Sequence, residues 1–255
     1  IGTYDNNIES GIFKLELDNN TGEIFELQQV SKILNPSYMV MNKEKDILYS
    51  ILTKENSHGI AASKLGKNSL TPFSEILLDE KSTCHINTDK NNLYLFTANY
   101  KNGEVKTYKL GLNGEITGMI SEVNHNDMNL GEVHPHYVGL TPDEKYLFVV
   151  DLGLDILVVY EFLNGEIGKR VQNLEFKKGS GPRHLVFHNN GENAYVITEY
   201  SVEIASLKYS ASKTSSITTT FPSTGAIMWL SFKATVLFGF LKNCKIITKK
   251  KRTTS

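Results

Sequence analysis

The stretch "NLYLFTANYKNGEVKTYKLGLNGEI" (92–116) decides the fold of this chain. Two runs rich in aromatic and β-branched residues are separated by a short polar turn, and the second run ends in an Asn-Gly turn. Runs of this kind, bounded by turn-forming residues, predict β-strands joined as hairpins. No segment before residue 204 shows a sustained helical period of apolar residues. The chain is therefore predicted to be all-β.

The same pattern recurs along the chain. Strand-like runs open near residues 46, 92, 145 and 193, at intervals of about 45 to 55 residues. The second half of the quoted stretch resembles "LDILVVYEFLNGEI" (154–167) and "SGIFKLELDNNTGEI" (10–24). Four strands in each repeat of about 40 to 50 residues are typical of propeller blades. We expect a β-propeller with about four to five recognisable blades in residues 1–205, and a solenoid is the second interpretation.

Charge and cysteine content restrict the class of protein. The 255 residues carry a formal net charge of -1, which favours neither nucleic acid nor an acidic surface as a partner. The two cysteines, Cys84 and Cys244, form no disulfide framework, as is usual in a reducing compartment. We therefore expect a cytoplasmic protein, and nothing in the sequence indicates an oligomeric state.

The composition changes abruptly near residue 204. All 28 acidic residues lie at or before Glu203, whereas lysines continue to the run "KKKR" (249–252). We interpret residues 206–255 as a divergent basic tail, produced by a frameshift or by degeneration of a blade; a genuine but divergent blade is an alternative. A tail anchor over 226–241 is a further alternative, but this run of 16 residues contains Lys233. It is shorter than the roughly 20 apolar residues that span a bilayer, so no membrane contact is expected.

Several motifs occur together in a fixed order: "NPSYMV" (35–40), "HPHY" (134–137), "DLGLD" (151–155) and "GPRHLVFH" (181–188). In this order they resemble the lactonase family of seven-bladed β-propellers. The resemblance implies hydrolysis of a sugar lactone, with 6-phosphogluconolactone of the pentose phosphate pathway as the expected substrate. A muconate-type lactonizing enzyme, a non-catalytic binding propeller and an inactive gene fragment are the alternatives, because fold does not fix function.

Lactone hydrolysis needs a base to activate water, donors for the developing oxyanion, and groups that hold the substrate. The resemblance implies that Arg183 and Glu199 line the central cleft as catalytic residues, although an Arg beside a carboxylate can also be a plain ion pair. It also implies an active-site histidine in "HPHY", and His136 is favoured over His134. The predicted substrate-binding residues are His134, His85, His184 and Tyr100.

Strict alternation along "GPRHLVFH" would place Arg183, Leu185 and Phe187 on one face of the strand and His184, Val186 and His188 on the other. Asp151 and Asp155 are expected to accept hydrogen bonds from backbone amides. His58 and His125 lie in polar loops and are expected to be solvated. The histidines and Glu199 match no metal-ligand spacing, so neither a metal nor another cofactor is predicted.

Overall fold

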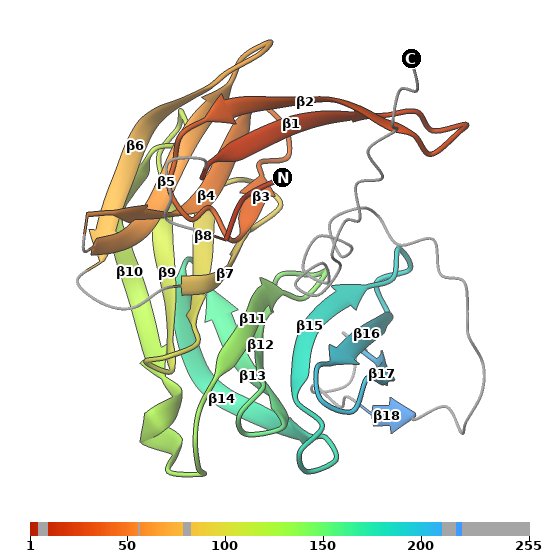
Figure 1. Cartoon of the computed structure of the whole chain (residues 1–255). Coiled ribbons are helices and arrows are strands. Elements are labelled where there is room, and N and C mark those ends of the chain that lie inside the picture. Colours follow the sequence, from red (N-terminus) through yellow and green to blue (C-terminus); the bar gives the residue numbers. More distant parts are fainter. Residues whose placement is uncertain (5–9, 56, 79–82, 211–217, 221–255) are drawn as a thin grey trace.

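The computed structural model of this chain describes residues 1–4, 10–55, 57–78, 83–210 and 218–220. Its antiparallel sheets follow one another around a central axis (Figure 1). The first sheet has two strands, β1 (Ile12–Leu17) and β2 (Ile24–Ser31), and Gly2 bridges to Ile12. The other described sheets have four strands each, and these lie in chain order.

The strands of the four-stranded sheets have these bounds: β3 Met39–Met41, β4 Ile47–Lys54, β5 Ser57–Leu65 and β6 Leu70–Leu78; β7 Thr83–Thr88, β8 Tyr94–Asn99, β9 Glu104–Leu110 and β10 Ile116–Asn124; β11 Pro135–Leu140, β12 Tyr146–Asp151, β13 Ile156–Leu163 and β14 Glu166–Glu175; β15 Pro182–Phe187, β16 Asn193–Thr198, β17 Ile204–Lys208 and β18 Thr218–Thr220. One short 3₁₀ helix, η1 (His125–Met128), precedes β11. The prediction of an all-β propeller is confirmed, and the runs expected at 46, 92, 145 and 193 are β4, β8, β12 and β16.

Alternating side chains on one strand enter two different cores. In β12, Phe148 and Val150 pack in the cluster shared with β15, β16 and β17. Leu147 and Val149, from the same strand, pack in the cluster shared with the β7–β10 sheet. All four side chains are at most 1% exposed. A strand with a period of two can therefore join its sheet to both neighbours.

Hydrogen bonds connect two of the repeated Asn-Gly turns to the preceding sheet. The N–H of Ile116 donates to Oγ of Ser74 at 3.0 Å, and the N–H of Ile167 donates to Oγ of Ser121 at 3.2 Å. The buried hydroxyl of Tyr49 donates to the carbonyl of Gly114 at 2.9 Å. The turn sequence that repeats along the chain therefore occupies the same structural position in successive sheets.

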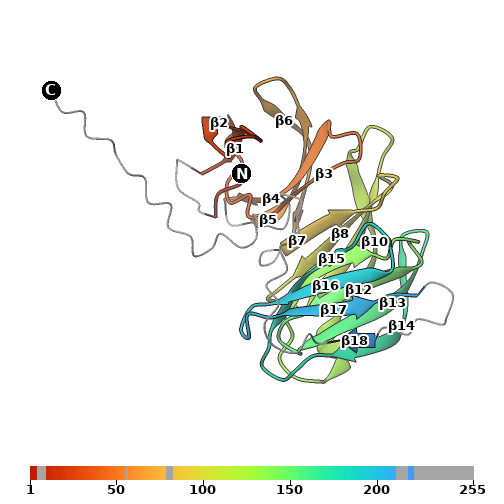
Figure 2. The same cartoon turned by 90° about the vertical axis from the view of Figure 1, so that its right-hand side faces the viewer.

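The inner strands β3, β7, β11 and β15 lie nearest to the axis, because each is the first strand of its sheet and borders the next inner strand. Figure 2 shows the last sheet, with β15, β16, β17 and β18 side by side. This arrangement brings residues that are about 50 positions apart in sequence to equivalent places around the axis.

The predicted boundary at residue 205 falls inside the last sheet. β17 runs to Lys208 and pairs with β18 over Thr218–Thr220. The interpretations of the basic tail beyond residue 220, including the candidate anchor over 226–241, lie outside the described residues. Within the part of the chain that is described, no helix is both long and apolar enough to cross a membrane.

Two equivalent glycines provide a test of this packing. Gly114 (φ +81°) has Ile47 Cδ1 2.3 Å and Tyr49 Oη 2.9 Å from the place of an added Cβ, whereas Gly22 (φ +74°) has nothing within 4 Å. Gly22→Ala should cost about 1 kcal/mol of unfolding free energy, because a left-handed backbone disfavours alanine. Gly114→Ala should cost about 1–3 kcal/mol more through overpacking. Urea denaturation of both variants measures the difference, and equal losses would contradict the packing of the turn on the preceding sheet.

Candidate functional site

The inner strands begin with a break in register. Pro135 pairs with Asp151 but Tyr137 pairs with Val150, so His136 is an extra residue in β11. The same one-residue bulge occurs at Cys84 in β7 and at Arg183 in β15. A β-bulge redirects a side chain and is common beside functional sites. We call the end of the channel marked by Cys84, His136 and Arg183 the mouth.

The bulge makes the expectation of strict alternation wrong at Arg183. Leu185 is buried in the core shared with β11–β14, and Phe187 packs against that core, as alternation predicts. Arg183 is itself the extra residue, because Pro182 pairs with Thr198 and His184 pairs with Ile197, so it stands outside the alternation of the strand. The extra residue in β15 therefore brings both Arg183 and His184 to the channel.

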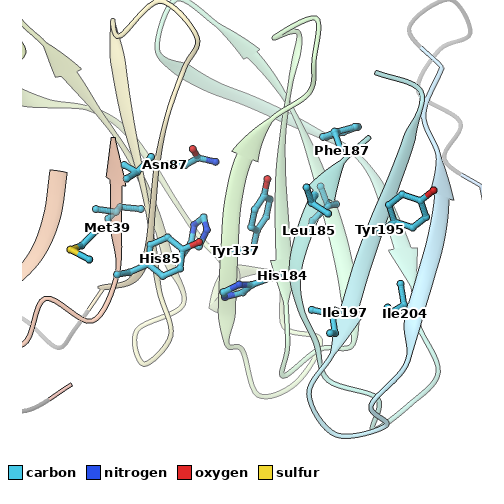
Figure 3. A pocket seen from close by; sticks show the side chains of 14 residues that line it. Met39, His85, Asn87, Tyr137, His184, Leu185, Phe187, Tyr195, Ile197 and Ile204 are labelled. Atoms are coloured by element: carbon cyan, nitrogen blue, oxygen red, sulfur yellow. The ribbon is translucent and has the colours of Figure 1, made fainter. Parts of the chain in front are cut away.

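The residue that follows each bulge occupies an equivalent position on the inner strand. These residues are His85, Tyr137 and His184. Figure 3 shows the three rings side by side, each coming from a different strand. The ring centroids of His85 lie 4.7 Å from Tyr137 and 5.5 Å from His184. The register of three sheets therefore builds a band of aromatic rings around the channel.

A cavity of about 220 Å³ lies along this band (Figure 3). Its wall includes Tyr38, His85, Asn87, Tyr137 and His184 and continues onto the face of β16. Of the predicted site residues, only His85 and His184 line the cavity; the others lie at the mouth. The site thus has an aromatic interior and a polar entrance.

The predicted pair at the mouth is formed. Nη1 of Arg183 lies 2.7 Å from Oε2 of Glu199, and their side chains are 18% and 40% exposed. Nε of Arg183 is buried and has no hydrogen-bond partner within the described residues. A guanidinium carries several N–H donors, so an arginine that binds a carboxylate with one nitrogen can bind a substrate oxygen with another.

The histidines in the interior are held neutral. Burial lowers the pKa of His184 to about 3, and the Arg183 guanidinium lowers it further in the same direction. Burial, and next His184 and His136, lower the pKa of His85 well below its usual range. Nδ1 of His85 accepts the N–H of Val138 at 3.3 Å, which leaves Nε2 as the protonated nitrogen. Neutral imidazoles can donate hydrogen bonds here, but His85 and His184 are poor bases at neutral pH.

The remaining predicted residues join this group. His136 is 8% exposed, and its ring lies 5.2 Å from His184 and 5.8 Å from Tyr100. His134 stacks on Tyr100 at 4.1 Å, and its Nδ1 bonds to the carbonyl of Tyr100 at 3.0 Å. His134 also contacts Glu132, so its polar atoms are used in holding the loop. Ring contacts therefore connect His134, Tyr100, His136, His184 and His85 in sequence.

Two carboxylates support the mouth, as expected: Asp151, which is buried, and Asp155, which is partly buried. Oδ1 of Asp151 accepts the N–H groups of His134, Gly153 and Leu154, and Asp155 accepts those of Gly179 and Gly181. The expectation that His125 is solvated is wrong. Its side chain is fully buried, and its Nδ1 lies 2.6 Å from Oδ2 of Asp151. His58 is partly buried and bonds to Thr53 at 3.2 Å, because the β4–β5 pairing places these two residues opposite each other.

Sequence reasoning missed two tyrosines. The ring of Tyr38 lies 4.4 Å from His85 and 5.8 Å from His184. Tyr200 lies against Gly181, where an added Cβ would meet its ring at 2.6 Å. Burial, the adjacent Tyr200 hydroxyl and the carboxylate of Glu199 raise the pKa of Tyr100 to about 12. Tyr38 lies inside the motif "NPSYMV" and Tyr200 directly follows Glu199, but only the folded chain brings them to the site.

The side chains of the site are not arranged as the ligand set of a metal ion. Among the residues with described positions, no group of three or more His, Cys, Asp or Glu side chains is arranged to hold an ion. The geometry therefore supplies one cation, one carboxylate and several neutral rings around a partly enclosed space.

Comparison with known proteins agrees with this architecture. The family model described as "Lactonase, 7-bladed beta-propeller" matches residues 1–227. The chain belongs to this lactonase family. The 6-phosphogluconolactonase of Bacillus subtilis is 36% identical over 215 residues, which cover 82% of this chain and 61% of that protein. This lactonase-family chain spans about three fifths of the length of the curated relatives that it matches.

Solved structures show the same fold. A protein from Lactobacillus plantarum has a TM-score of 0.77 and 29% identity, over 86% of this chain and 64% of that one. The periplasmic gluconolactonase PpgL of Pseudomonas aeruginosa also has a TM-score of 0.77, with 22% identity, over 89% of this chain and 68% of that one. The lactonase family thus accounts for the order of sheets and for the motifs at their inner strands.

The neutral histidines predict a pH-dependent stability. The unfolded chain takes up protons on His85 and His184 as pH falls through 6.5, whereas both pKa values are much lower in the folded chain. The unfolded state then binds more protons, so stability is full above pH 6.5 and falls by up to about 1.4 kcal/mol per pH unit for each histidine below it. Urea denaturation between pH 5 and 7 measures this slope.

The control for this experiment is His188, which is exposed at the far end of β15. His184→Asn should reduce the slope between pH 5 and 6.5, and His188→Asn should leave it unchanged. An unchanged slope in His184→Asn would show that His184 is not held neutral by the fold.

Proposed function

We propose that this chain hydrolyses a sugar lactone and that its substrate is 6-phosphogluconolactone, which would make it an enzyme of the pentose phosphate pathway in the cytoplasm. The observation that carries the proposal is the Arg183–Glu199 pair at 2.7 Å, beside buried imidazoles, in a member of the lactonase family. The name of the Bacillus subtilis relative supports the choice of substrate.

Arg183 holds the reacting group in this mechanism. Glu199 binds one terminal nitrogen of the guanidinium and fixes its plane, and the guanidinium stands at the partly exposed mouth, where a substrate oxygen can approach it. As water attacks the lactone carbonyl, negative charge develops on the carbonyl oxygen. A fixed cation in a partly dry site stabilises that charge more strongly than it would in water.

His136 is the proposed general base. It is buried at the bulge of β11, next to His184 and in the same position on its strand as Arg183 on β15. His136 takes a proton from the attacking water and returns it to the ring oxygen when the carbon–oxygen bond of the tetrahedral intermediate breaks. His85 and His184 remain neutral and donate hydrogen bonds, because their lowered pKa values suit them poorly to accept a proton.

The ion pair with Arg183 also limits the role of Glu199. Its carboxylate is 40% exposed and is bound to Arg183, so one of its oxygens is already engaged by the guanidinium. We therefore assign Glu199 to the orientation of Arg183 and retain it as the second candidate for the base. His134 and Tyr100 form the outer wall, where the stack of their rings is available to the substrate.

The test compares two arginines of the same chain. The purified full-length chain should hydrolyse 6-phosphogluconolactone faster than the lactone opens spontaneously. Arg183→Ala should lose at least about 10²-fold in kcat/KM, the usual effect of removing one group that stabilises an oxyanion. Arg170→Ala changes an exposed arginine of the outer strand β14 and should retain full activity.

Arg183→Lys separates charge from geometry. Lysine keeps the cation but lacks the planar fork that binds a carboxylate and a second oxygen at once, so most of the loss should remain. No acceleration by the wild-type chain would refute the enzymatic proposal. Equal activities of wild type and Arg183→Ala would refute the role of the Arg183–Glu199 pair.

A further inference from the structure

Tyr38 crosses the channel between sheets that are not adjacent. It precedes β3, yet its ring contacts His184 of β15 at 5.8 Å, although the β7–β10 and β11–β14 sheets lie between these two strands in the ring. Its ring also lies 4.4 Å from His85. The backbone carbonyl of Tyr38 accepts the N–H of Ile51. Ile51 occupies the position on β4 that Ala98, the residue opposite His85, occupies on β8. Tyr38 is thus the β3-side member of the same aromatic band.

The Tyr38 hydroxyl lies in a polar environment inside that band. Cys84 and Arg183, which stand at two of the bulges, both act electrostatically on the phenol. Burial raises the pKa of Tyr38 to about 12, Cys84 raises it, and Arg183 opposes the rise. The phenol therefore keeps its proton at every pH at which the protein would be assayed, and it is available as a donor.

The hydroxyl also differs from those of structural tyrosines in this chain. Tyr49 donates to the carbonyl of Gly114, and Tyr209 donates to Asp143, so each hydroxyl stabilises the fold. No hydrogen bond from the Tyr38 hydroxyl is formed within the described residues, and Tyr38 lines the cavity. A donor held at the wall of a cavity by ring packing, without a protein acceptor, is suited to a ligand.

We propose that Tyr38 is a catalytic residue whose hydroxyl donates a hydrogen bond to the same lactone oxygen that Arg183 contacts. This inference rests on the proposed function. Arg183 comes from β15 and Tyr38 from the segment before β3, and the ring contact between Tyr38 and His184 holds Tyr38 beside the chain neighbour of Arg183. Two donors that the fold holds in fixed positions form an oxyanion site without reorganisation during the reaction.

The pairing also fits the chemistry of the oxyanion. Arg183 provides positive charge, and Tyr38 provides a neutral hydrogen-bond donor. The Tyr38 hydroxyl keeps its proton during the reaction, because its pKa is raised to about 12. The reaction itself is unchanged: water adds to the carbonyl carbon, the ring carbon–oxygen bond breaks, and the water proton passes to the ring oxygen.

Tyr38→Phe tests the inference, because it removes one oxygen and keeps the ring contacts with His85 and His184. We expect kcat for 6-phosphogluconolactone to fall about 10²-fold, with KM within about threefold of wild type, since the donor acts mainly in the transition state. The melting temperature should stay within about 2 °C of wild type. Tyr108→Phe alters a buried tyrosine of β9, in the core between two sheets, and should retain the wild-type kcat.

The outcomes separate this inference from the proposed function. If wild type is active and Tyr38→Phe is within twofold of it, the role of Tyr38 is refuted and the proposed function stands. A rise in KM with unchanged kcat would also refute a catalytic role, because it indicates equal binding of substrate and transition state. A loss of kcat matched by Tyr108→Phe would refute it as well, since the loss would then be structural. No turnover by the wild-type chain would overturn both proposals.

Discussion

The packing of each sheet against the next is the interaction on which the rest of the structure depends. Four clusters of buried side chains lie between successive described sheets, and each four-stranded sheet between two others contributes to two of them. Because Phe148 and Leu147 are neighbours on one strand yet enter different clusters, no sheet can move without disturbing both sides. This coupling fixes the inner strands around the axis and so sets the distances within the site.

The chemistry at the mouth arises from a repeated irregularity of the backbone. A single extra residue at the start of β7, β11 and β15 places Cys84, His136 and Arg183 at equivalent positions. The regular register resumes directly afterwards and supplies His85, Tyr137 and His184 as the aromatic band. A single local device, repeated by the blade architecture, therefore produces both a polar layer and an aromatic layer.

Electrostatics divides these layers by function. The interior histidines are neutral because they are buried, and for His184 also because a guanidinium is its neighbour. Arg183 stands at the partly exposed mouth, where Glu199 forms an ion pair with it. Asp151 and Asp155 accept hydrogen bonds from backbone N–H groups, and these bonds hold the loops that carry the site residues. The site therefore combines a fixed cation with a dry wall of hydrogen-bond donors, as a reaction that develops negative charge requires.

The sequence by itself determined the repeat and the strands, and its motifs predicted most of the candidate site residues. Alternating aromatic and β-branched runs with Asn-Gly turns depend on local preferences, so β4, β8, β12 and β16 could be predicted at close to their observed positions. The hydrogen bonds that Asp151 accepts from Gly153 and Leu154 were also predictable, because these residues are close to it in the chain. The membership of Arg183 and Glu199 came from their place in recognisable motifs.

Only the tertiary structure decided the direction of Arg183, the burial of His125 and the presence of Tyr38 in the site. The bulge at Arg183 depends on pairing with β16, and it overrides the alternation that the strand sequence predicts. His125 stands in a polar loop but meets Asp151 26 residues away. Tyr38 reaches His184 from another sheet across the channel. These contacts are long-range, so they follow from the closure of sheets around an axis and not from any local pattern of residues.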